Sequence, residues 1–300
     1  MRSPKRFSRR SLAAVGLALA LGISAGCKSN QFGGTMNTGQ EKDLGAQYAS
    51  QIESQSHIDM DGKLNRRILD IATPIFAQAQ KERPDVSYRI RIIDDPEVNA
   101  FSLPGGYIYV YRGLLDKLGN DDDAVACVIG HETAHVVRRH IVKQIADSQG
   151  KDLLVGLAAI LSRSNTVGQI GSTVAELDQL HYSREAEYEA DRWGEKFAYN
   201  AGYDPSGMIR TFRIFEDQEK RTGSPEPYSR DHPINRNRIL RALEQLRELR
   251  ANKGQYVAEQ YDPNDDKIAA QKNGIEYQAL VLATQVPATV AAQTSAETAR

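Results

Sequence analysis

Cysteine, net charge and long apolar runs are all scarce in this sequence. Its 300 residues include two cysteines and carry a formal net charge of -1. No apolar stretch reaches the roughly 20 residues that a membrane-spanning helix needs. Residues 1–26 carry five basic side chains and no acid, so the remainder is net acidic and a nucleic-acid partner is excluded. At 40% hydrophobic residues, the length is sufficient for one main domain with a full core.

Residues 1–26 have the pattern of a secretory signal. A basic start is followed by the apolar run Leu12–Ile23 and by small residues before Cys27. Ala25-Gly26-Cys27 resembles a bacterial lipoprotein cleavage site, although Ser24 stands where a leucine is usual. We therefore expect a signal peptide over 1–26, a lipidated Cys27 and a flexible tether over 27–40. Ordinary cleavage without lipid is the alternative, and Arg9-Arg10 leaves both the Sec and the twin-arginine routes open.

Lipidation has two consequences. If Cys27 carries lipid, Cys127 has no partner for an intramolecular disulfide, and we expect it to be a small core residue. Lys28, rather than an aspartate, follows the lipidated cysteine and favours the inner leaflet of the outer membrane, facing the periplasm.

The motif with the clearest chemical meaning is His131-Glu132-Thr133-Ala134-His135. Residues four apart share one face of an α-helix, so both histidines can direct a ring nitrogen at one metal ion, with Glu132 beside them. The acidic residues before Ala124, the lack of proline up to Val137 and the basic pair Arg138-Arg139 all favour a helix here. This is the geometry of a metalloprotease site. A surface helix with two unliganded histidines is the alternative.

Other elements are predicted around this motif. Apolar residues at helical spacing predict two helices between residues 41 and 80, broken at Asp61-Gly62. Strand-like runs at 86–93, 98–103 and 107–111 predict a small, mainly antiparallel sheet next to the metal helix. An edge strand beside the cleft, at Asn99, Ala100 and Phe101, can pair with an extended peptide substrate. The apolar segment 152–161 is expected to be a core helix, with a flap over the cleft as the alternative.

A later helix, expected over residues 176–199, holds Glu187 and Asp191 on one face. This spacing lets Glu187 ligate the metal while Asp191 bonds the free ring nitrogen of a histidine ligand. A generic acidic helix face explains Glu185 and Glu189 equally well, but it does not explain why such a pair follows the histidine motif.

These motifs, in this order, resemble those of the zinc metallopeptidases that include HtpX and the CAAX-prenyl endopeptidase. The resemblance covers roughly residues 41–245. Its matching segments are 99–106, 131–135, Ser183-Arg184 with Glu187 and Ala190-Asp191, and His232-Pro233 with Arg238-Ile239. Without strongly apolar spanning segments, the chain is more similar to the soluble periplasmic branch of the BepA and LoiP type. Two features depart from relatives: Asp231 replaces a common threonine or serine, and the chain after Arg250 is too short for helical repeats.

The resemblance implies an α+β, mostly helical, zincin-like domain over residues 41–250. An extension over 251–300 follows, and the Ala-, Thr- and Gln-rich composition of residues 286–300 predicts that its end is disordered. One Zn²⁺ per chain is expected on His131, His135 and Glu187, with Glu132 as the base that takes a proton from water. Asp191 is expected to orient a ligand histidine, and Arg238 to brace the site electrostatically.

His232 is implied to lie near the cleft. There it either stabilises the oxyanion or occupies the open metal position, and an ordinary loop histidine is the third possibility. The charge of the neighbouring Asp231 would favour the protonated, donating form.

The predicted function is that of a zinc metalloendopeptidase of the bacterial envelope. Its substrates would be unfolded or misassembled periplasmic and outer-membrane proteins, and its lipid would anchor it to the membrane. The alternative is an assembly factor or chaperone-like binding protein whose metal site is mostly closed. The sequence does not determine the oligomeric state or the identity of the substrate.

Overall fold

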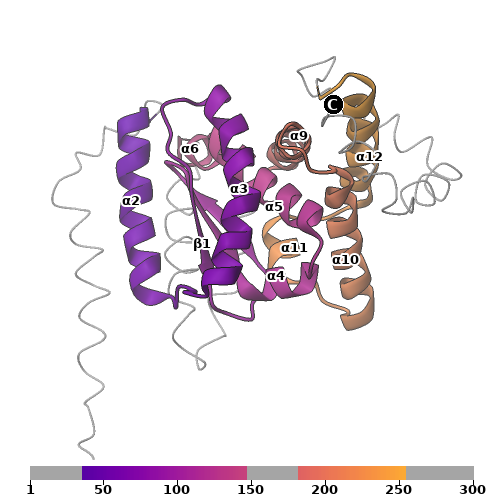
Figure 1. Cartoon of the computed structure of the whole chain (residues 1–300), viewed down its shortest axis with the longest axis horizontal. Coiled ribbons are helices and arrows are strands. Elements are labelled where there is room, and N and C mark those ends of the chain that lie inside the picture. Colours follow the sequence, from indigo (N-terminus) through magenta and orange to yellow (C-terminus); the bar gives the residue numbers. More distant parts are fainter. Residues whose placement is uncertain (1–35, 147–181, 255–300) are drawn as a thin grey trace, which may run out of the picture.

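A three-stranded sheet and the helix over residues 122–137 form the centre of the computed structural model, which describes residues 36–146 and 182–254 (Figure 1). The elements before residue 147 are, in chain order, α2 (Thr38–Gln55), α3 (Gly62–Glu82), β1 (Arg89–Ile93), β2 (Ala100–Leu103), β3 (Tyr107–Tyr111), α4 (Arg112–Leu118), α5 (Asp122–Val137) and α6 (His140–Ala146). Those after residue 181 are α9 (Arg184–Asn200), α10 (Ser206–Thr222), α11 (Pro227–Asp231) and α12 (Arg236–Ala251). The predicted fold class, mostly helical α+β with a small sheet beside the metal helix, is confirmed.

The sheet has the strand order β1-β3-β2, with β3 in the middle. β2 and β3 form the expected antiparallel hairpin, and the turn depends on Gly105 and Gly106, whose φ angles are +76° and +99°. β1 pairs with the other edge of β3 in parallel, from Arg89 opposite Tyr107 to Ile93 opposite Tyr111. The sheet is therefore mixed rather than mainly antiparallel. β3 takes the central place because its middle residues are buried on both faces, as a strand covered on two sides requires.

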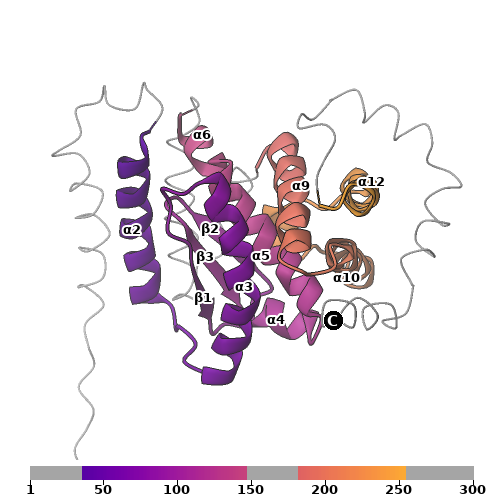
Figure 2. The same cartoon turned by 45° about the horizontal axis from the view of Figure 1, so that its top comes forward.

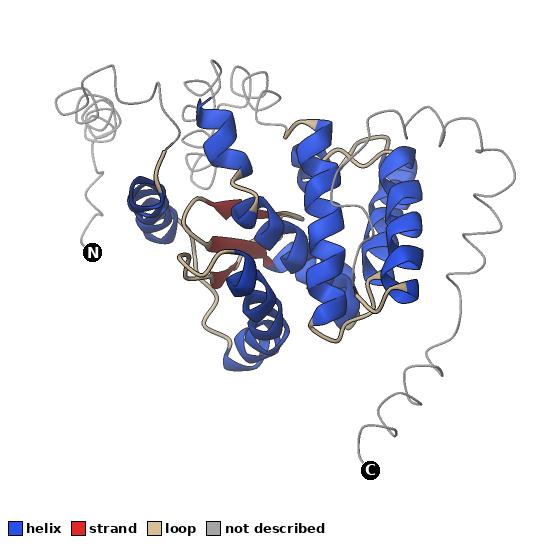
Figure 3. Ribbon diagram, turned by 90° about the horizontal axis from the view of Figure 1, so that it is seen from above, coloured by secondary structure: helices blue, strands red, loops and turns tan. Residues whose placement is uncertain are grey.

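Each face of the sheet packs against different helices (Figure 2). Ile90, Ile92, Ile108 and Val110 belong to the core shared with α3 and α5, whereas Tyr109 packs in a second cluster with α2. This separation follows from the alternation of side chains along a strand. Figure 3 shows the strands enclosed between helices in this way. The result is that α5 lies against the sheet with its whole length from Ala124 to Val137 buried.

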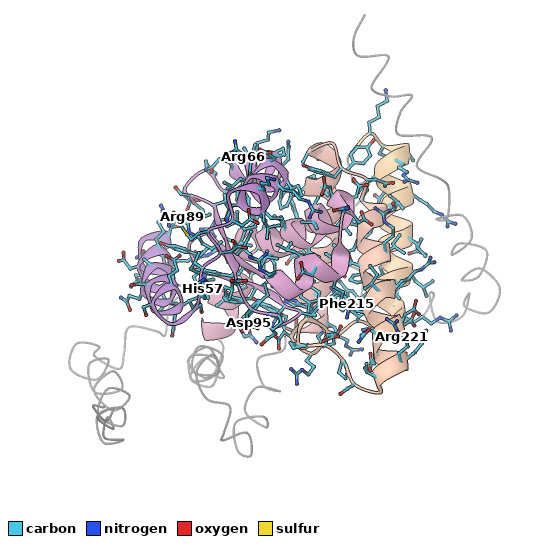
Figure 4. The ribbon with its side chains drawn as sticks, turned by 60° about the horizontal axis from the view of Figure 1, so that its bottom comes forward. His57, Arg66, Arg89, Asp95, Phe215 and Arg221 are labelled. Atoms are coloured by element: carbon cyan, nitrogen blue, oxygen red, sulfur yellow. The ribbon has the colours of Figure 1, made fainter. Side chains whose placement is uncertain are left out.

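The second half of the described chain packs on the opposite side of α5. α9 and α10 both contact α5, and α12 contacts α9 and α10. Phe215 of α10 is buried in this helical part and stacks on Tyr228, while Arg221 extends outward from the end of the same helix (Figure 4). Cys127 is fully buried between α5 and these helices, in agreement with its predicted role as a core residue. α5 is thus enclosed by the sheet on one side and helices on the other.

Element boundaries differ from the predictions at several places: β1 and β2 begin later than the predicted runs at 86–93 and 98–103, and two helices also start elsewhere. α2 begins at Thr38, capped by Asn37, so it includes the last residues of the expected tether. α9 begins at Arg184 rather than at residue 176, because Ser183 has extended backbone and caps the helix by accepting from the amide of Ala186. Its predicted end is confirmed: Asn200 is the last helical residue and Gly202 has a φ of +93°.

Several predictions fall outside the described residues. They are the signal peptide, Cys27 and most of the tether, the apolar segment 152–161, and the extension beyond residue 254. Within the described ranges, the helices are too short or too polar to cross a membrane.

Candidate metal centre

The helix that carries the histidine motif is fixed by its own sequence. Asp121 caps it by accepting a hydrogen bond from the amide of Ala124, and Asp122 and Asp123 lie in its first turn, where negative charge suits the helix dipole. Arg210 of α10 donates to Asp121 at 2.6 and 2.8 Å and joins this end of α5 to the second half of the domain. The predicted cap and acidic start of the metal helix are confirmed.

A glycine contact brings α9 close to α5. A Cβ atom added to Gly130 would lie 2.7 Å from the carbonyl oxygen of Gly194, and one added to Gly194 would lie 2.7 Å from the amide nitrogen of His131. Only residues without side chains permit such an approach. The contact sets the distance between the two helices at the level of the histidines, and it brings the acidic face of α9 within reach of them.

Four side chains converge at this crossing. The Nε2 atoms of His131 and His135 are 3.0 Å apart. The carboxylate of Glu187 lies 3.6 Å from the first of these nitrogens and 3.4 Å from the second. His232 completes the group, since its Nδ1 is 3.2 Å from His131 Nε2 and 3.0 Å from Glu187 Oε1. One donor atom from each of the four lies within 4.8 Å of the others, and all four residues are buried.

This donor set fits a zinc ion. Zinc–nitrogen bonds of roughly 2.0–2.1 Å in a tetrahedron separate the ligand atoms by about 3.3 Å, which is close to the spacing of these nitrogens and oxygens. Imidazole nitrogens and one carboxylate are also the ligands that zinc prefers. The structure therefore brings together the three predicted ligands and adds the ring of His232 to the same group.

Asp191 and Arg238 hold two of these side chains in place. Asp191 Oδ1 lies 2.9 Å from His131 Nδ1, and this contact favours the tautomer with the proton on Nδ1, whose Nε2 lone pair faces the centre. Arg238, which is 1% exposed, donates to both oxygens of Asp191 at 2.8 and 2.7 Å and lies 2.6 Å from Glu187 Oε2. Burial raises the pKa of Glu187, but the charge of Arg238 and the nearby histidines outweigh it and hold that pKa well below its ordinary value. Both carboxylates are thereby kept ionised.

Glu132 lies on the same helix as the two histidines and is fully buried. Its Oε1 is 3.3 Å from His232 Nε2. Burial raises its pKa, which brings the carboxylate closer to the range in which it can accept and return a proton near neutral pH. Glu132 is therefore placed beside the ligand group and is suited to move a proton.

His232 lies at the C-terminal end of α11, where its amide donates to the carbonyl of Tyr228 at 2.8 Å. Burial lowers the pKa of its imidazole, but the charges of Glu187 and Glu132 outweigh burial and raise it to about 9. Contrary to expectation, Asp231 is not among the main causes of this shift; its carboxylate accepts a hydrogen bond from Asn99 at 2.9 Å. The residues that set the charge of His232 are those of the metal centre.

The predicted substrate strand lies on the edge of the sheet, because β2 has only β3 as a neighbour in the described structure. The three side chains predicted to contact the substrate all make contacts within the domain. Asn99 is buried and bonds Asp231, Ala100 is buried in the main core, and Phe101 stacks on Tyr109 at 5.1 Å in the cluster with α2. These three side chains are thus engaged within the domain, and it is the backbone of β2 that lacks a second strand neighbour among the described residues.

The sequence analysis missed three residues around His135. His140 places its Nδ1 2.8 Å from His135 Nδ1, and its Nε2 lies 2.9 Å from Glu189 Oε2. Tyr182 stacks on the ring of His135, with centroids 3.8 Å apart. Burial raises the pKa of Glu189, but hydrogen bonds from His140 and Arg138 lower it to about 2. Glu189 is therefore more than part of a generic acidic face, and the only sequence signal was a third histidine soon after the motif.

Comparison with known proteins gives a consistent result. The model of "Peptidase family M48" matches residues 60–246. A putative beta-barrel assembly-enhancing protease of Vibrio cholerae is 28% identical over 225 residues, covering 72% of this chain and 46% of that protein. The mitochondrial metalloendopeptidase OMA1 of Schizosaccharomyces pombe is 31% identical, covering 56% of this chain and 50% of its own. The metalloprotease LoiP of Escherichia coli is 27% identical over 77% of this chain and 93% of its own length. The chain thus spans about half the length of the first two relatives.

Proposed function

This chain belongs to peptidase family M48, a family of zinc metallopeptidases, and from that premise we propose that it is an endopeptidase of the bacterial cell envelope that cleaves unfolded or misassembled envelope proteins. The observation that carries the proposal is the convergence of His131, His135 and Glu187 next to the buried carboxylate of Glu132. The name of the relative from Vibrio cholerae, a putative beta-barrel assembly-enhancing protease, supports an envelope role.

In this proposal His131, His135 and Glu187 hold one zinc ion per chain. Bound zinc supplies Lewis acidity, which polarises a carbonyl group and lowers the pKa of water. Asp191 keeps the proton of His131 on Nδ1, so that Nε2 is free to ligate. Arg238 neutralises part of the charge of the two carboxylates and holds both in position.

Glu132 acts as the general base and then as the general acid. It takes a proton from the attacking water and returns it to the nitrogen of the leaving amine, so the carboxylate ends the cycle in its starting form. Burial favours this role because it raises the pKa of the carboxyl group. Full burial on a packed helix leaves the Glu132 side chain little freedom to move away from the ligand histidines.

His232 has two possible roles in the proposed reaction. In the described conformation its Nδ1 lies among the ligand atoms, which supports a role as a plug of the fourth metal position. Rotation of the α11 end away from the centre would free that position and leave the ring as a donor to the oxyanion. The plug is the role that the described distances favour.

The second candidate function is an assembly factor or chaperone-like binding protein with a mostly closed site. The position of His232 favours this function, because an imidazole ring held within the ligand group would keep water and substrate from the metal. In that case the edge strand β2 would bind extended segments of envelope proteins without cleavage.

Cleavage by the wild type and by Glu132→Gln separates the two functions. The substrate is a urea-unfolded outer-membrane protein, and mass spectrometry of new N-termini reports peptide-bond hydrolysis. We expect Glu132→Gln to lower the rate about 100-fold or more while keeping its zinc, since only the proton carrier is lost. The control is Glu185→Gln, an exposed residue of α9 that should cleave at the wild-type rate. A zinc-loaded wild type that binds the substrate but cleaves no faster than Glu132→Gln would refute the peptidase and leave the binding protein.

The envelope location is proposed on the sequence of residues 1–28, with lipid on Cys27 and the outer membrane as its destination. Mass spectrometry of the mature N-terminus tests it, and fractionation of Cys27→Ser serves as the comparison. A mature chain that begins at another residue and carries no lipid would refute the anchor.

A further inference from the structure

The two ligand histidines of α5 are supported in different ways. His131 Nδ1 meets the carboxylate of Asp191 directly, at 2.9 Å. His135 Nδ1 meets no carboxylate among the described residues. It lies 2.8 Å from Nδ1 of His140, whose other nitrogen lies 2.9 Å from Glu189 Oε2. A second histidine therefore stands between His135 Nδ1 and the carboxylate of Glu189.

The ring protons in the hydrogen-bonded series His135, His140 and Glu189 can be assigned from its two ends. If His135 ligates through Nε2, as its position 3.0 Å from His131 Nε2 implies, its ring proton must be on Nδ1. His135 then donates to His140 Nδ1, because two ring nitrogens 2.8 Å apart can share only one proton. The proton of His140 is left on Nε2, where it is donated to Glu189. Each nitrogen in the series is satisfied by one bond.

The backbone bends sharply to make this contact. In a continuous helix, a residue five positions after His135 would lie about 140° around the axis, away from it. Instead α5 ends at Val137, and Arg139 adopts the left-handed conformation with a φ of +57°. This conformation is unfavourable for a residue with a side chain. Arg139 is held there by an ion pair of 3.0 Å with the buried Glu41 of α2. The strained residue turns the start of α6 so that His140 faces back to the metal helix.

Glu189 is held from the other side. It is two residues from both Glu187 and Asp191, so it leaves α9 on a different face from theirs and does not reach His135 itself. Arg138, at the end of α5, donates to Glu189 Oε1 at 2.6 Å. The arginine and the imidazole of His140 thus occupy separate oxygens of the carboxylate. The geometry is specific enough to fix the ring of His140, which is 5% exposed.

We propose that His140 and Glu189 are positioning residues for the metal ligand His135: they fix its ring orientation and its tautomer, as Asp191 does for His131. The inference rests on the proposed function, because it takes His135 as a ligand. Groups that bond the outer nitrogen of a ligand histidine typically change metal affinity by roughly 10–100-fold. His140 is then part of what makes the site bind zinc, without touching the metal.

The test measures zinc dissociation constants by competition with a chromophoric chelator, using the full-length mature protein. We expect His140→Ala to bind zinc roughly 10–100-fold more weakly than the wild type. His140→Asn should recover most of the affinity, since its amide oxygen can accept from His135 at the place of Nδ1. The zinc affinity of Glu189→Gln should lie between those of His140→Ala and His140→Asn. Glu185→Gln, an exposed position on the same helix, is the matched control.

A purely structural role of His140 is distinguished by the melting temperature of the metal-free protein. If His140 has a positioning role, His140→Ala weakens zinc binding while this melting temperature stays near the wild-type value. His140→Asn then restores the zinc dissociation constant. Wild-type affinity in His140→Ala, or an equal loss in His140→Asn and His140→Ala, would overturn the inference. If His140→Ala does not fold, the constants of His140→Asn and Glu189→Gln decide: an affinity of Glu189→Gln within twofold of the wild type would overturn it.

Different results would refute the proposed function. It predicts about one zinc per wild-type chain and a large loss of zinc in Glu187→Gln. Absence of either result would refute the ligand set itself. Normal zinc binding by the wild type, its loss in Glu187→Gln and unchanged affinity in the His140 variants would refute only the inference made here.

Discussion

Replacement of Arg238 tests how the buried charges of the centre are balanced. Arg238 is 1% exposed and is the cation that contacts both Glu187 and Asp191, at 2.6 to 2.8 Å. Arg238→Met keeps most of the side-chain volume but leaves two buried carboxylates without this partner. Removal of one member of a buried ion pair typically costs about 3–5 kcal/mol. Since whole domains are stable by only about 5–15 kcal/mol, the metal-free variant should lose a large part of its stability.

Urea unfolding of the metal-free protein measures this loss. With a urea dependence of about 2 kcal/mol per molar, the midpoint should fall by roughly 1.5–2.5 M. Zinc should reduce the difference, because its charge compensates Glu187 in the absence of the arginine. The control is Arg247→Met, an exposed position of the same helix, which should unfold within about 0.5 kcal/mol of the wild type.

A double variant shows whether stranded charge is the cause. Arg238→Met combined with Asp191→Leu removes the carboxylate that lost both hydrogen bonds, and should be more stable than additivity of the two single changes predicts. A metal-free Arg238→Met protein that unfolds within about 0.5 M urea of the wild type would refute the reasoning, since the two carboxylates would then not depend on the arginine.

Three further predictions concern the fourth metal position, the helix crossing and the helix cap. His232→Ala should raise the cleavage rate if His232 plugs the metal position and lower it about 100-fold if it is an oxyanion donor, while zinc content stays intact; unchanged kinetics would leave it without a role in the reaction. Gly194→Ala forces a Cβ to within 2.7 Å of the backbone of His131, so it should lower the melting temperature and weaken zinc binding in a chelator titration; wild-type values of both would show that the crossing can relax. Burial raises the pKa of Asp121, but the hydrogen bond from Arg210 outweighs it and the net shift is downward, so its contribution to stability is present above the ordinary carboxyl pKa of about 3.9 and is lost as the pH falls below it. Asp121→Asn keeps the cap but not the charge, so thermal unfolding should place it below the wild type at pH 7 and level with it in strong acid, and an unchanged difference at both pH values would contradict this.

The sequence determined those features that depend on residues close together in the chain. The spacing of His131 and His135 places them on one face of α5, and the spacing of Glu187 and Asp191 does the same on α9, because helix geometry repeats every few residues. Capping by Asp121 and the turn at Gly105 and Gly106 were equally readable, since a cap or a tight turn is set by a few neighbouring side chains and backbone angles.

The tertiary structure alone decided what depends on contacts between distant segments. Strand alternation does not specify a neighbour, and only competition for the buried central place put β3 between β1 and β2 and made the sheet mixed. Likewise, the charge of His232 is set by Glu187 and Glu132 from two other helices, not by the adjacent Asp231. His140 meets His135 only because Arg139, bound to Glu41 of a distant helix, takes a left-handed conformation that local preference disfavours. Such contacts follow from the packing of whole elements, and the energy of that packing exceeds the local preferences that a sequence pattern reports.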